Sequence, residues 1–217
     1  MAGASAVRED GSNLSRADRA FHRVETALAL AAGTTIFLLM LLSVAQILGR
    51  KLLNMPVPGF IDWVEQAMAV FAFLGVAYTQ RLGGHIRMDI LVGQLKGRAL
   101  WLAEFVSTLL MLALTLALTV GAWRHFLRAF DFGSPLWSRD SSIDIALPLW
   151  PAKLLVPVAL GLLAVRLMLQ LWAYARAFRE NPEHPVGAPM ILTAAEEAAA
   201  EAEHVAGAED DMREGAR

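Results

Sequence analysis

The longest uncharged run in this sequence covers 24 residues, from Thr26 to Gly49, and Leu and Ala dominate it. An α-helix rises about 1.5 Å per residue, so this run can cross the roughly 30 Å hydrocarbon core of a bilayer. Three further apolar blocks follow it along the chain. The sequence therefore predicts four membrane-spanning helices, over residues 24–49, 60–81, 102–124 and 147–175.

Composition agrees with this fold class, an all-α integral membrane protein. Only 18% of the residues are charged, whereas soluble domains carry about 25%. There is no cysteine, which excludes disulfides and thiolate chemistry. The five histidines lie outside the uncharged runs, so the spans offer no paired axial ligands for haem. ATPase, zinc-protease and esterase motifs are also absent from the sequence. We therefore expect no enzyme activity, no cofactor, no metal site and no nucleic-acid partner.

The two ends of the chain differ from the membrane domain between them. Residues 1–20 are polar, and we expect them to form a cytoplasmic segment ahead of a four-span domain over residues 21–179. Residues 180–217 hold ten acidic residues and two arginines, which is typical of a disordered acidic tail. Lys and Arg number ten on the face shared with the termini and six on the opposite face. This imbalance favours cytoplasmic termini.

Two acidic residues open the second predicted span. Asp62 and Glu65 are three residues apart, which puts them on one face of a helix. They could bind a cation or relay protons, and a small proton-coupled exporter would need Glu65 at mid-bilayer. We favour a position at headgroup depth, where carboxylates suit the N-terminal end of a helix dipole.

Arg166 lies about two-thirds of the way along the fourth predicted span. A charge at this depth is costly in a bilayer, so it needs a partner or a route to the headgroups. A carboxylate or an anionic substrate could pair with it. We expect instead that Arg166 snorkels to the cytoplasmic headgroups or faces another subunit.

The segment that follows the second span is the most distinctive part of the sequence. Gly75 and Ala72 predict a small-residue face that another helix can approach closely. Gly83 and Gly84 then end the helix. Residues 85–101 mix apolar and basic side chains, which is typical of a short helix lying in the cytoplasmic membrane interface.

This segment resembles the small permease subunit of tripartite ATP-independent periplasmic (TRAP) transporters, and the resemblance covers roughly residues 24–179. The stretches that carry it follow one another in the family's order: Asp62 or Glu65, Phe73–Val76, Gly84–Asp89, Leu147–Pro151, Val156–Pro157 and Ala164–Leu167. Family members often have two adjacent acids before the second span, whereas Asp62 and Glu65 are separated here.

The resemblance implies a part in an inner-membrane importer driven by an ion gradient, with sodium as the expected ion and organic acids as expected solutes. In such a system a periplasmic binding protein captures the solute, and a large membrane subunit holds the substrate and ion sites. The small subunit braces the fixed scaffold of the large one and binds no substrate itself. The candidates for subunit-interface or structural roles are Asp62, Glu65, Gly75, His85, Arg87, Asp89 and Arg166.

The extracytoplasmic loops, residues 49–62 and 124–150, would then lie where a binding protein docks. The polar groups available for docking are Arg128, Asp131, Arg139, Asp140 and Asp144. A function of a different class stays open at this point. The chain could be a membrane anchor or assembly subunit of an unrelated enzyme complex, holding a catalytic partner through its tail.

Overall fold

The computed structural model describes residues 13–81 and 98–180 of the chain. This part of the chain is built from helices and has only two isolated β-bridges, Phe130–Ser138 and Ser141–Pro148. In chain order the elements are α1 (Asn13–Leu48), η1 (Gly49–Leu53), α2 (Phe60–Leu74), α3 (Val76–Arg81), α5 (Arg98–Ala129), η2 (Pro135–Trp137) and α6 (Trp150–Glu180). The π-helical turn η1 continues α1, and η2 is a single 3-10 turn.

Four helical segments are long and apolar enough to cross a membrane: Asn13–Leu53, Phe60–Arg81, Arg98–Ala129 and Trp150–Arg179. The predicted all-α integral membrane fold with four spans is thereby confirmed. The first helix begins at Asn13 and so includes residues 13–20, which the sequence had placed in a separate polar segment. The buried carboxylate of Asp18 is stable in this stretch because Arg81 and Arg166 neutralise it.

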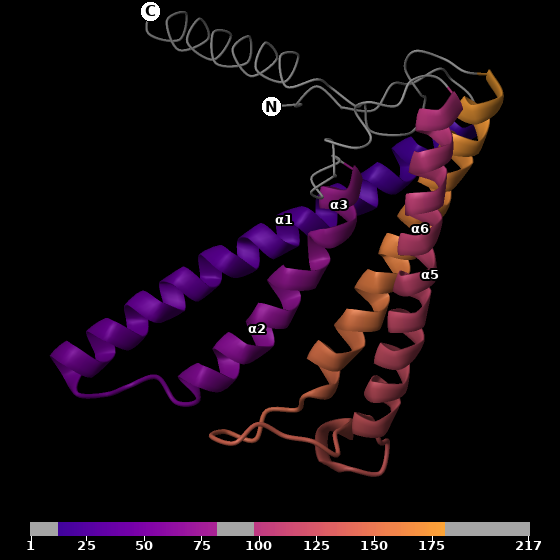
Figure 1. Cartoon of the computed structure of the whole chain (residues 1–217). Coiled ribbons are helices and arrows are strands. Elements are labelled where there is room, and N and C mark those ends of the chain that lie inside the picture. Colours follow the sequence, from indigo (N-terminus) through magenta and orange to yellow (C-terminus); the bar gives the residue numbers. More distant parts are fainter. Residues whose placement is uncertain (1–12, 82–97, 181–217) are drawn as a thin grey trace, which may run out of the picture.

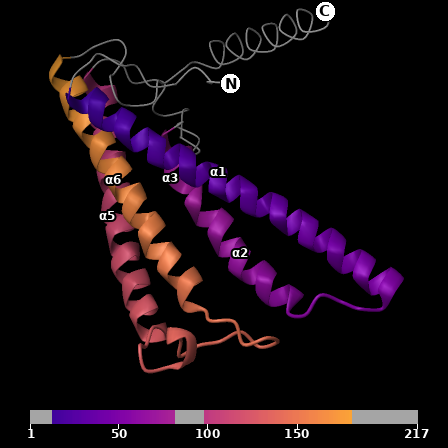
Figure 2. The same ribbon diagram turned by 180° about the vertical axis from the view of Figure 1, so that it is seen from behind.

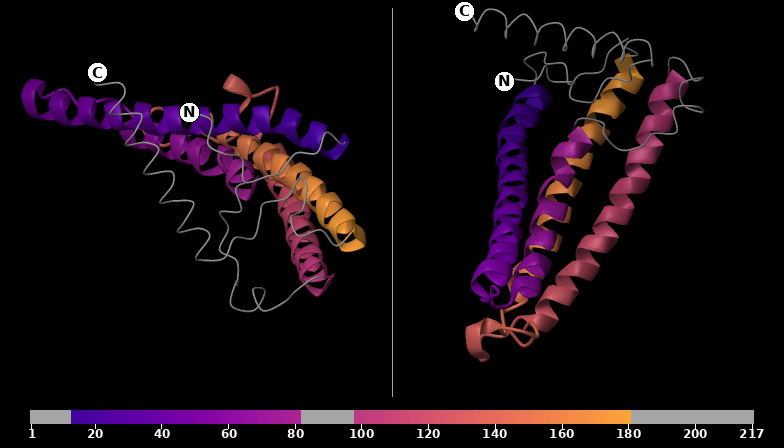
Figure 3. Two further views of the ribbon diagram at one scale, coloured as in Figure 1. Left: turned by 90° about the horizontal axis from the view of Figure 1, so that it is seen from above. Right: turned by 90° about the vertical axis from the view of Figure 1, so that its left-hand side faces the viewer.

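The helices form two adjacent pairs, α1 with α2 and α5 with α6 (Figures 1 and 2). The pairs meet at the end of the molecule where α1 begins, and they diverge toward the loops at residues 54–59 and 130–149. Helix α6 also contacts α1, α2 and α3, so it is the central helix of the fold. The views in Figure 3 show α2 and α6 between α1 and α5.

Two apolar clusters hold α6 against its neighbours. The first lies where the helix pairs meet and contains Leu14, Trp101, Ala173, Tyr174 and Ala177. The second lies farther along α5 and α6 and contains Leu112, Leu163, Ala164 and Leu167. Small residues on α6 in both clusters let the helices approach closely, which favours association inside a bilayer.

Large apolar side chains cover the outside of the first and third spans. On α1 the exposed ones include Ile36, Phe37, Leu38, Met40, Leu41, Val44, Ile47 and Leu48. On α5 they include Leu102, Leu109, Leu110, Leu114, Leu116, Leu118 and Val120. Surfaces of this kind are stable against lipid chains or another membrane helix, and not against water.

Several predicted features lie outside the described residues. These are the interfacial helix over residues 85–97, the positions His85, Arg87 and Asp89, and the acidic tail beyond residue 180. The end of the predicted interfacial stretch is described, and there Arg98–Trp101 form the first turn of α5.

Candidate functional site

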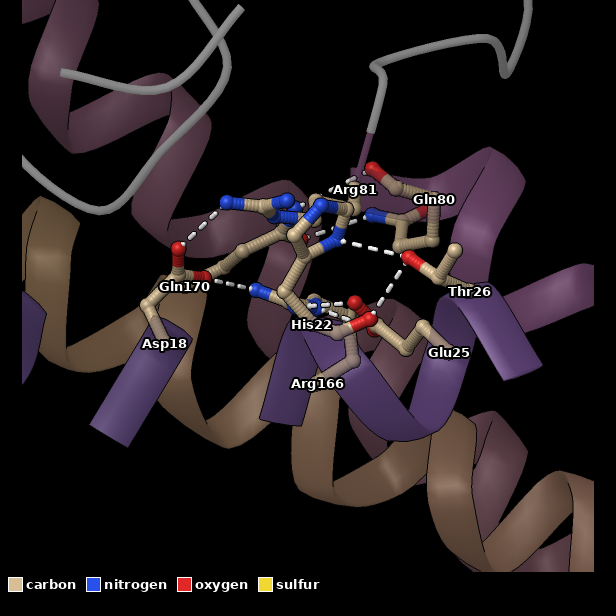
Figure 4. Close-up of polar contacts among 8 residues, drawn as sticks. All are labelled: Asp18, His22, Glu25, Thr26, Gln80, Arg81, Arg166 and Gln170. Atoms are coloured by element: carbon tan, nitrogen blue, oxygen red, sulfur yellow. Dashed lines mark hydrogen bonds and ion pairs between the residues drawn. The ribbon is translucent and has the colours of Figure 1, made fainter. Parts of the chain in front are cut away.

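Four charged side chains from three different helices meet about halfway along α6, where α1 and α3 approach it (Figure 4). Arg166 of α6 donates from Nε to Glu25 Oε1 at 2.6 Å and from Nη2 to the other carboxylate oxygen. Its Nη1 contacts Asp18 Oδ1, and Arg81 of α3 bonds the second oxygen of Asp18 at 2.7 Å. We call these four residues the charge cluster. Its formal charges, two positive and two negative, cancel.

Neutral groups complete the surroundings of the charge cluster. Gln80 donates to Gln170 Oε1 at 2.8 Å, and Gln170 donates to the Gln80 backbone carbonyl at 3.2 Å. The guanidinium carbon of Arg166 lies 5.4 Å from the centre of the Phe21 ring, a favourable cation–π distance. These contacts tie α1 and α3 to α6 at a single point along the central helix.

Burial makes these contacts energetically important. Arg166 has no exposed surface, and Asp18 and Glu25 are each 1% exposed. Taking an ion out of water costs several kcal/mol, and Coulombic attraction and hydrogen bonds offset this cost only where the geometry is good. The bidentate contact between Arg166 and Glu25 provides such geometry. The cluster is therefore sensitive to the loss of any one member.

The expectation that Arg166 snorkels to the headgroups is wrong. The side chain is buried among other residues of the protein. Helix α1 begins at Asn13, eleven residues before the predicted span start at 24, and this added length places Asp18 beside Arg166. Pairing with carboxylates, the alternative considered for this residue, is what the structure shows.

Sequence reasoning missed Asp18, Glu25 and Arg81 as members of a site, although a signal was present. Asp18 and Glu25 are seven residues apart, two helical turns, with Phe21 between them on the same face. This spacing predicts one polar stripe on a helix. The sequence analysis did not detect this stripe because the predicted span was centred on the uncharged run that begins at Thr26, and both acids precede that run.

Asp62 lies at the loop end of the molecule, in the first turn of α2. Its Oδ2 atom accepts hydrogen bonds from Ser142 Oγ at 2.6 Å, Ile145 N at 2.9 Å and Asp144 N at 3.2 Å. The side chain is only 4% exposed. Asp62 is therefore a fastening point for the loop between α5 and α6, and its oxygen is already saturated by protein donors.

Glu65 is exposed, one turn farther along α2. Together with Asp62, Ser142 and Asp144 it lines a shallow hollow of about 450 Å³. The exporter hypothesis requires this carboxylate at mid-bilayer, but it lies near the loop end of the span. Within the described residues, no group of three or more His, Asp or Glu side chains is placed to hold a metal ion.

The loop between α5 and α6 brings most of the predicted docking residues together. Asp131 accepts hydrogen bonds from Gly133 N at 2.9 Å and from Arg139 Nε at 3.1 Å, and these two contacts lower the pKa of its carboxyl group. Lys153 bonds Asp140 and lowers the pKa of that carboxyl group. Arg128 and Asp144 have exposed side chains. Asp131, Arg139 and Asp140 therefore shape the loop, while Arg128 and Asp144 remain on its surface.

Gly75 separates α2 from α3 and lies in open space. A Cβ atom added there would meet nothing within 4 Å, and Ala72 beside it is exposed. No helix of the described chain occupies this face, so the small-residue surface that the sequence predicted is available to another molecule.

The family model for the DctQ component of tripartite ATP-independent periplasmic transporters matches residues 39–177. The chain belongs to the DctQ family. No curated protein matches it. The matched region includes Asp62, Arg81 and Arg166 but begins after Asp18 and Glu25. The DctQ match and the four apolar helices identify a small membrane subunit of a TRAP transporter, a multi-pass protein of the inner membrane.

The resemblance that the sequence suggested is thus confirmed. DctQ is a family of transporter components and not of enzymes. This result also weighs against the alternative of an anchor for an unrelated enzyme complex.

Proposed function

We propose that this DctQ-family chain is the static scaffold subunit of an ion-gradient-driven importer, with sodium as the coupling ion and organic acids as the solute class. The observation that carries the proposal is the charge cluster. Its four ionised groups bind one another and hold three helices together, so they are not available to carry an ion or a solute.

The partner in the membrane is the large permease subunit. The exposed apolar faces of α1 and α5 offer it a broad surface, and Ala72 and Gly75 offer a place for close helix contact. A scaffold needs a fixed shape, and the convergence of α1, α3 and α6 at the charge cluster supports that requirement.

A periplasmic binding protein is the second protein partner and the third component of the transporter. The C-terminal end of α5 and the loop over residues 130–149 form a suitable docking surface, because internal contacts hold the loop backbone while Arg128 and Asp144 face outward. In this arrangement the loops lie on the periplasmic side and both termini lie in the cytoplasm.

The proposal is tested by purifying the chain with a large TRAP permease subunit and a periplasmic binding protein from the same genome and measuring uptake in proteoliposomes. A ligand screen of the binding protein supplies the solute. We expect uptake to require all three proteins and an inward sodium gradient. Uptake that persists without this chain, or failure of the two membrane proteins to copurify, contradicts the scaffold role.

The docking surface has its own test in the same assay. Arg128→Glu and Asp144→Lys should each lower uptake several-fold and leave the membrane complex intact, because exposed interface charges mainly govern association. Arg179→Glu, an exposed position at the other end of the molecule, is the matched control. Unchanged uptake in both loop variants would exclude this surface as the docking site.

A further inference from the structure

A continuous row of aromatic rings runs from helix α5 into the following loop. Neighbouring ring centres are 4.8–5.5 Å apart for Trp123–Phe126, Phe126–Phe130, Phe130–Phe132 and Phe130–Trp150. Trp137 joins the row 6.4 Å from Phe132 and 6.3 Å from Trp150. The row therefore links two membrane-spanning helices through the loop segment 132–137.

This loop segment is closed on itself and held at its base. Asp131 N bonds the Trp137 carbonyl at 3.1 Å, and Arg139 N bonds the Ala129 carbonyl at 2.9 Å. Trp150 Nε1 donates to the Leu136 carbonyl at 3.0 Å. Figures 1 and 2 show the segment curled at the foot of α5. Its position relative to the membrane helices is thus fixed.

The outer side of the segment is apolar. Phe132 is 79% exposed, Leu136 68% and Trp137 53%. Leu136 and Trp137 both adopt left-handed backbone angles, with φ of 54° and 57°, which non-glycine residues rarely do. Strain of this kind is usually retained where it serves a function. Here it accompanies apolar side chains that the protein itself does not cover.

The patch is continuous with a surface that faces lipid or another membrane helix. Trp123 and Leu127 are exposed one turn apart on α5, and Phe130 follows at the next turn on the same face. Exposed Arg124 lies in the same last turns of the helix, at the depth where phosphates of a bilayer would be. Tryptophan prefers this boundary because its ring is apolar and its N–H is polar.

We propose that Phe132, Leu136 and Trp137 form a lipid anchor that inserts into the headgroup–acyl boundary of the adjacent leaflet. The ligand is phospholipid, bound by apolar insertion and by attraction between Arg124 and phosphate. The anchor fixes the depth of the loop, and the polar side of the loop stays in water. This inference needs only the membrane location of the chain and not its role as a scaffold.

The absence of cysteine from the chain makes a direct test simple. Leu136→Cys and Phe132→Cys place a thiol on the anchor, and Ile143→Cys is the matched control in the same loop, since Ile143 is 98% exposed and flanked by polar residues. The full-length variants are labelled in open membrane fragments with a maleimide–polyethylene glycol, and the labelled chain is detected by its gel shift. Labelling after denaturation in SDS gives the reference level.

We expect the water-soluble reagent to react about tenfold more slowly at positions 136 and 132 than at 143, because a thiol in apolar surroundings does not ionise. A lipid-soluble pyrene maleimide becomes concentrated in the bilayer and should therefore reduce this difference. Equal rates at 136 and 143 would overturn the proposal. Protection of position 136 from both reagents would also overturn it, because that result indicates a covering protein and not lipid.

Discussion

Arg166 is the residue of the charge cluster that pairs with both acids, Asp18 and Glu25. Arg166→Met leaves Asp18 and Glu25 with only Arg81 as a counter-ion, so one buried negative charge is uncompensated. We expect a loss of about 3–5 kcal/mol in stability, the usual cost of breaking a buried ion pair. Thermal unfolding of the detergent-purified full-length chain, followed by tryptophan fluorescence, measures the change. Arg179→Met, at an exposed position on the same helix, should have little effect.

Charge balance can be separated from the loss of contacts by a second variant. Glu25→Gln combined with Arg166→Met leaves Asp18 and Arg81 as a neutral pair. We expect the double variant to regain much of the stability that Arg166→Met loses, since uncharged replacements of buried ion pairs are often tolerated. A double variant that is less stable than either single variant would show that packing, and not charge, is decisive.

The sequence could predict that Arg166 requires a charged partner or contact with the headgroups, but not which residues surround it. Its partners Asp18 and Glu25 lie 148 and 141 positions away along the chain. Only the packing of α1 against α6 brings them together, and hydropathy contains no information on which helices pack. The four spans themselves were predictable because each depends on a local run of apolar residues.

The loop between α5 and α6 has a defined position because hydrogen bonds to Asp62 attach it to α2. In Asp62→Asn the neutral amide oxygen replaces a carboxylate that accepts three hydrogen bonds. Hydrogen bonds to charged groups contribute about 1.5–3 kcal/mol each. Amide hydrogen exchange at Asp144 and Ile145 should therefore become at least about tenfold faster, as measured by mass spectrometry.

The neighbouring acid provides the control for this prediction. Glu65 is exposed and lies on the same helix, so Glu65→Gln should leave exchange in the loop unchanged. Equal acceleration in both variants would mean that α2 as a whole, and not the Asp62 contact, determines the order of the loop. The sequence placed Asp62 correctly at the start of a helix but gave no sign of its loop partners, which lie 80–83 positions away.

Acid should loosen the same loop through two other carboxylates. Contacts with Gly133 and Lys153 hold the pKa values of Asp131 and Asp140 below their ordinary value of 3.8. A lowered pKa in the folded state means that the stabilisation is complete above about pH 3.8 and is lost as pH falls through the folded values. Trp137 and Trp150 lie in or beside the loop, so their fluorescence should change below about pH 3.8 and not between pH 5 and 8. A transition in that higher range would contradict these assignments.

The helices of the molecule are packed together at one end and separated at the other. Buried charges and an apolar cluster hold the helices together toward the end where α1 begins, while the helix pairs diverge toward the loops and leave apolar faces uncovered. A chain of this shape cannot bury its own surface, so it depends on lipid and on partner helices. We therefore expect the chain to be more stable in a membrane with its partner helices than when it is purified alone.

Orientation in the membrane is a property of the whole chain, and it rests on the distribution of basic residues. In the topology expected from the sequence, ten Lys and Arg residues lie on the side of the termini and six on the side of the loops. Arg81 is neutralised by Asp18, and without it the balance is still nine against six. The positive-inside rule therefore predicts that both termini lie in the cytoplasm.

Reporter fusions give a decisive measurement of this orientation. Alkaline phosphatase, which is active only outside the cytoplasm, should be inactive when fused after Arg217 and active when fused after Met55, in the loop that follows α1. A fluorescent protein that folds only in the cytoplasm should show the opposite pattern at the same two positions. Phosphatase activity after Arg217 would reverse the orientation. The loop over residues 130–149 would then lie in the cytoplasm, and a periplasmic binding protein could not dock there.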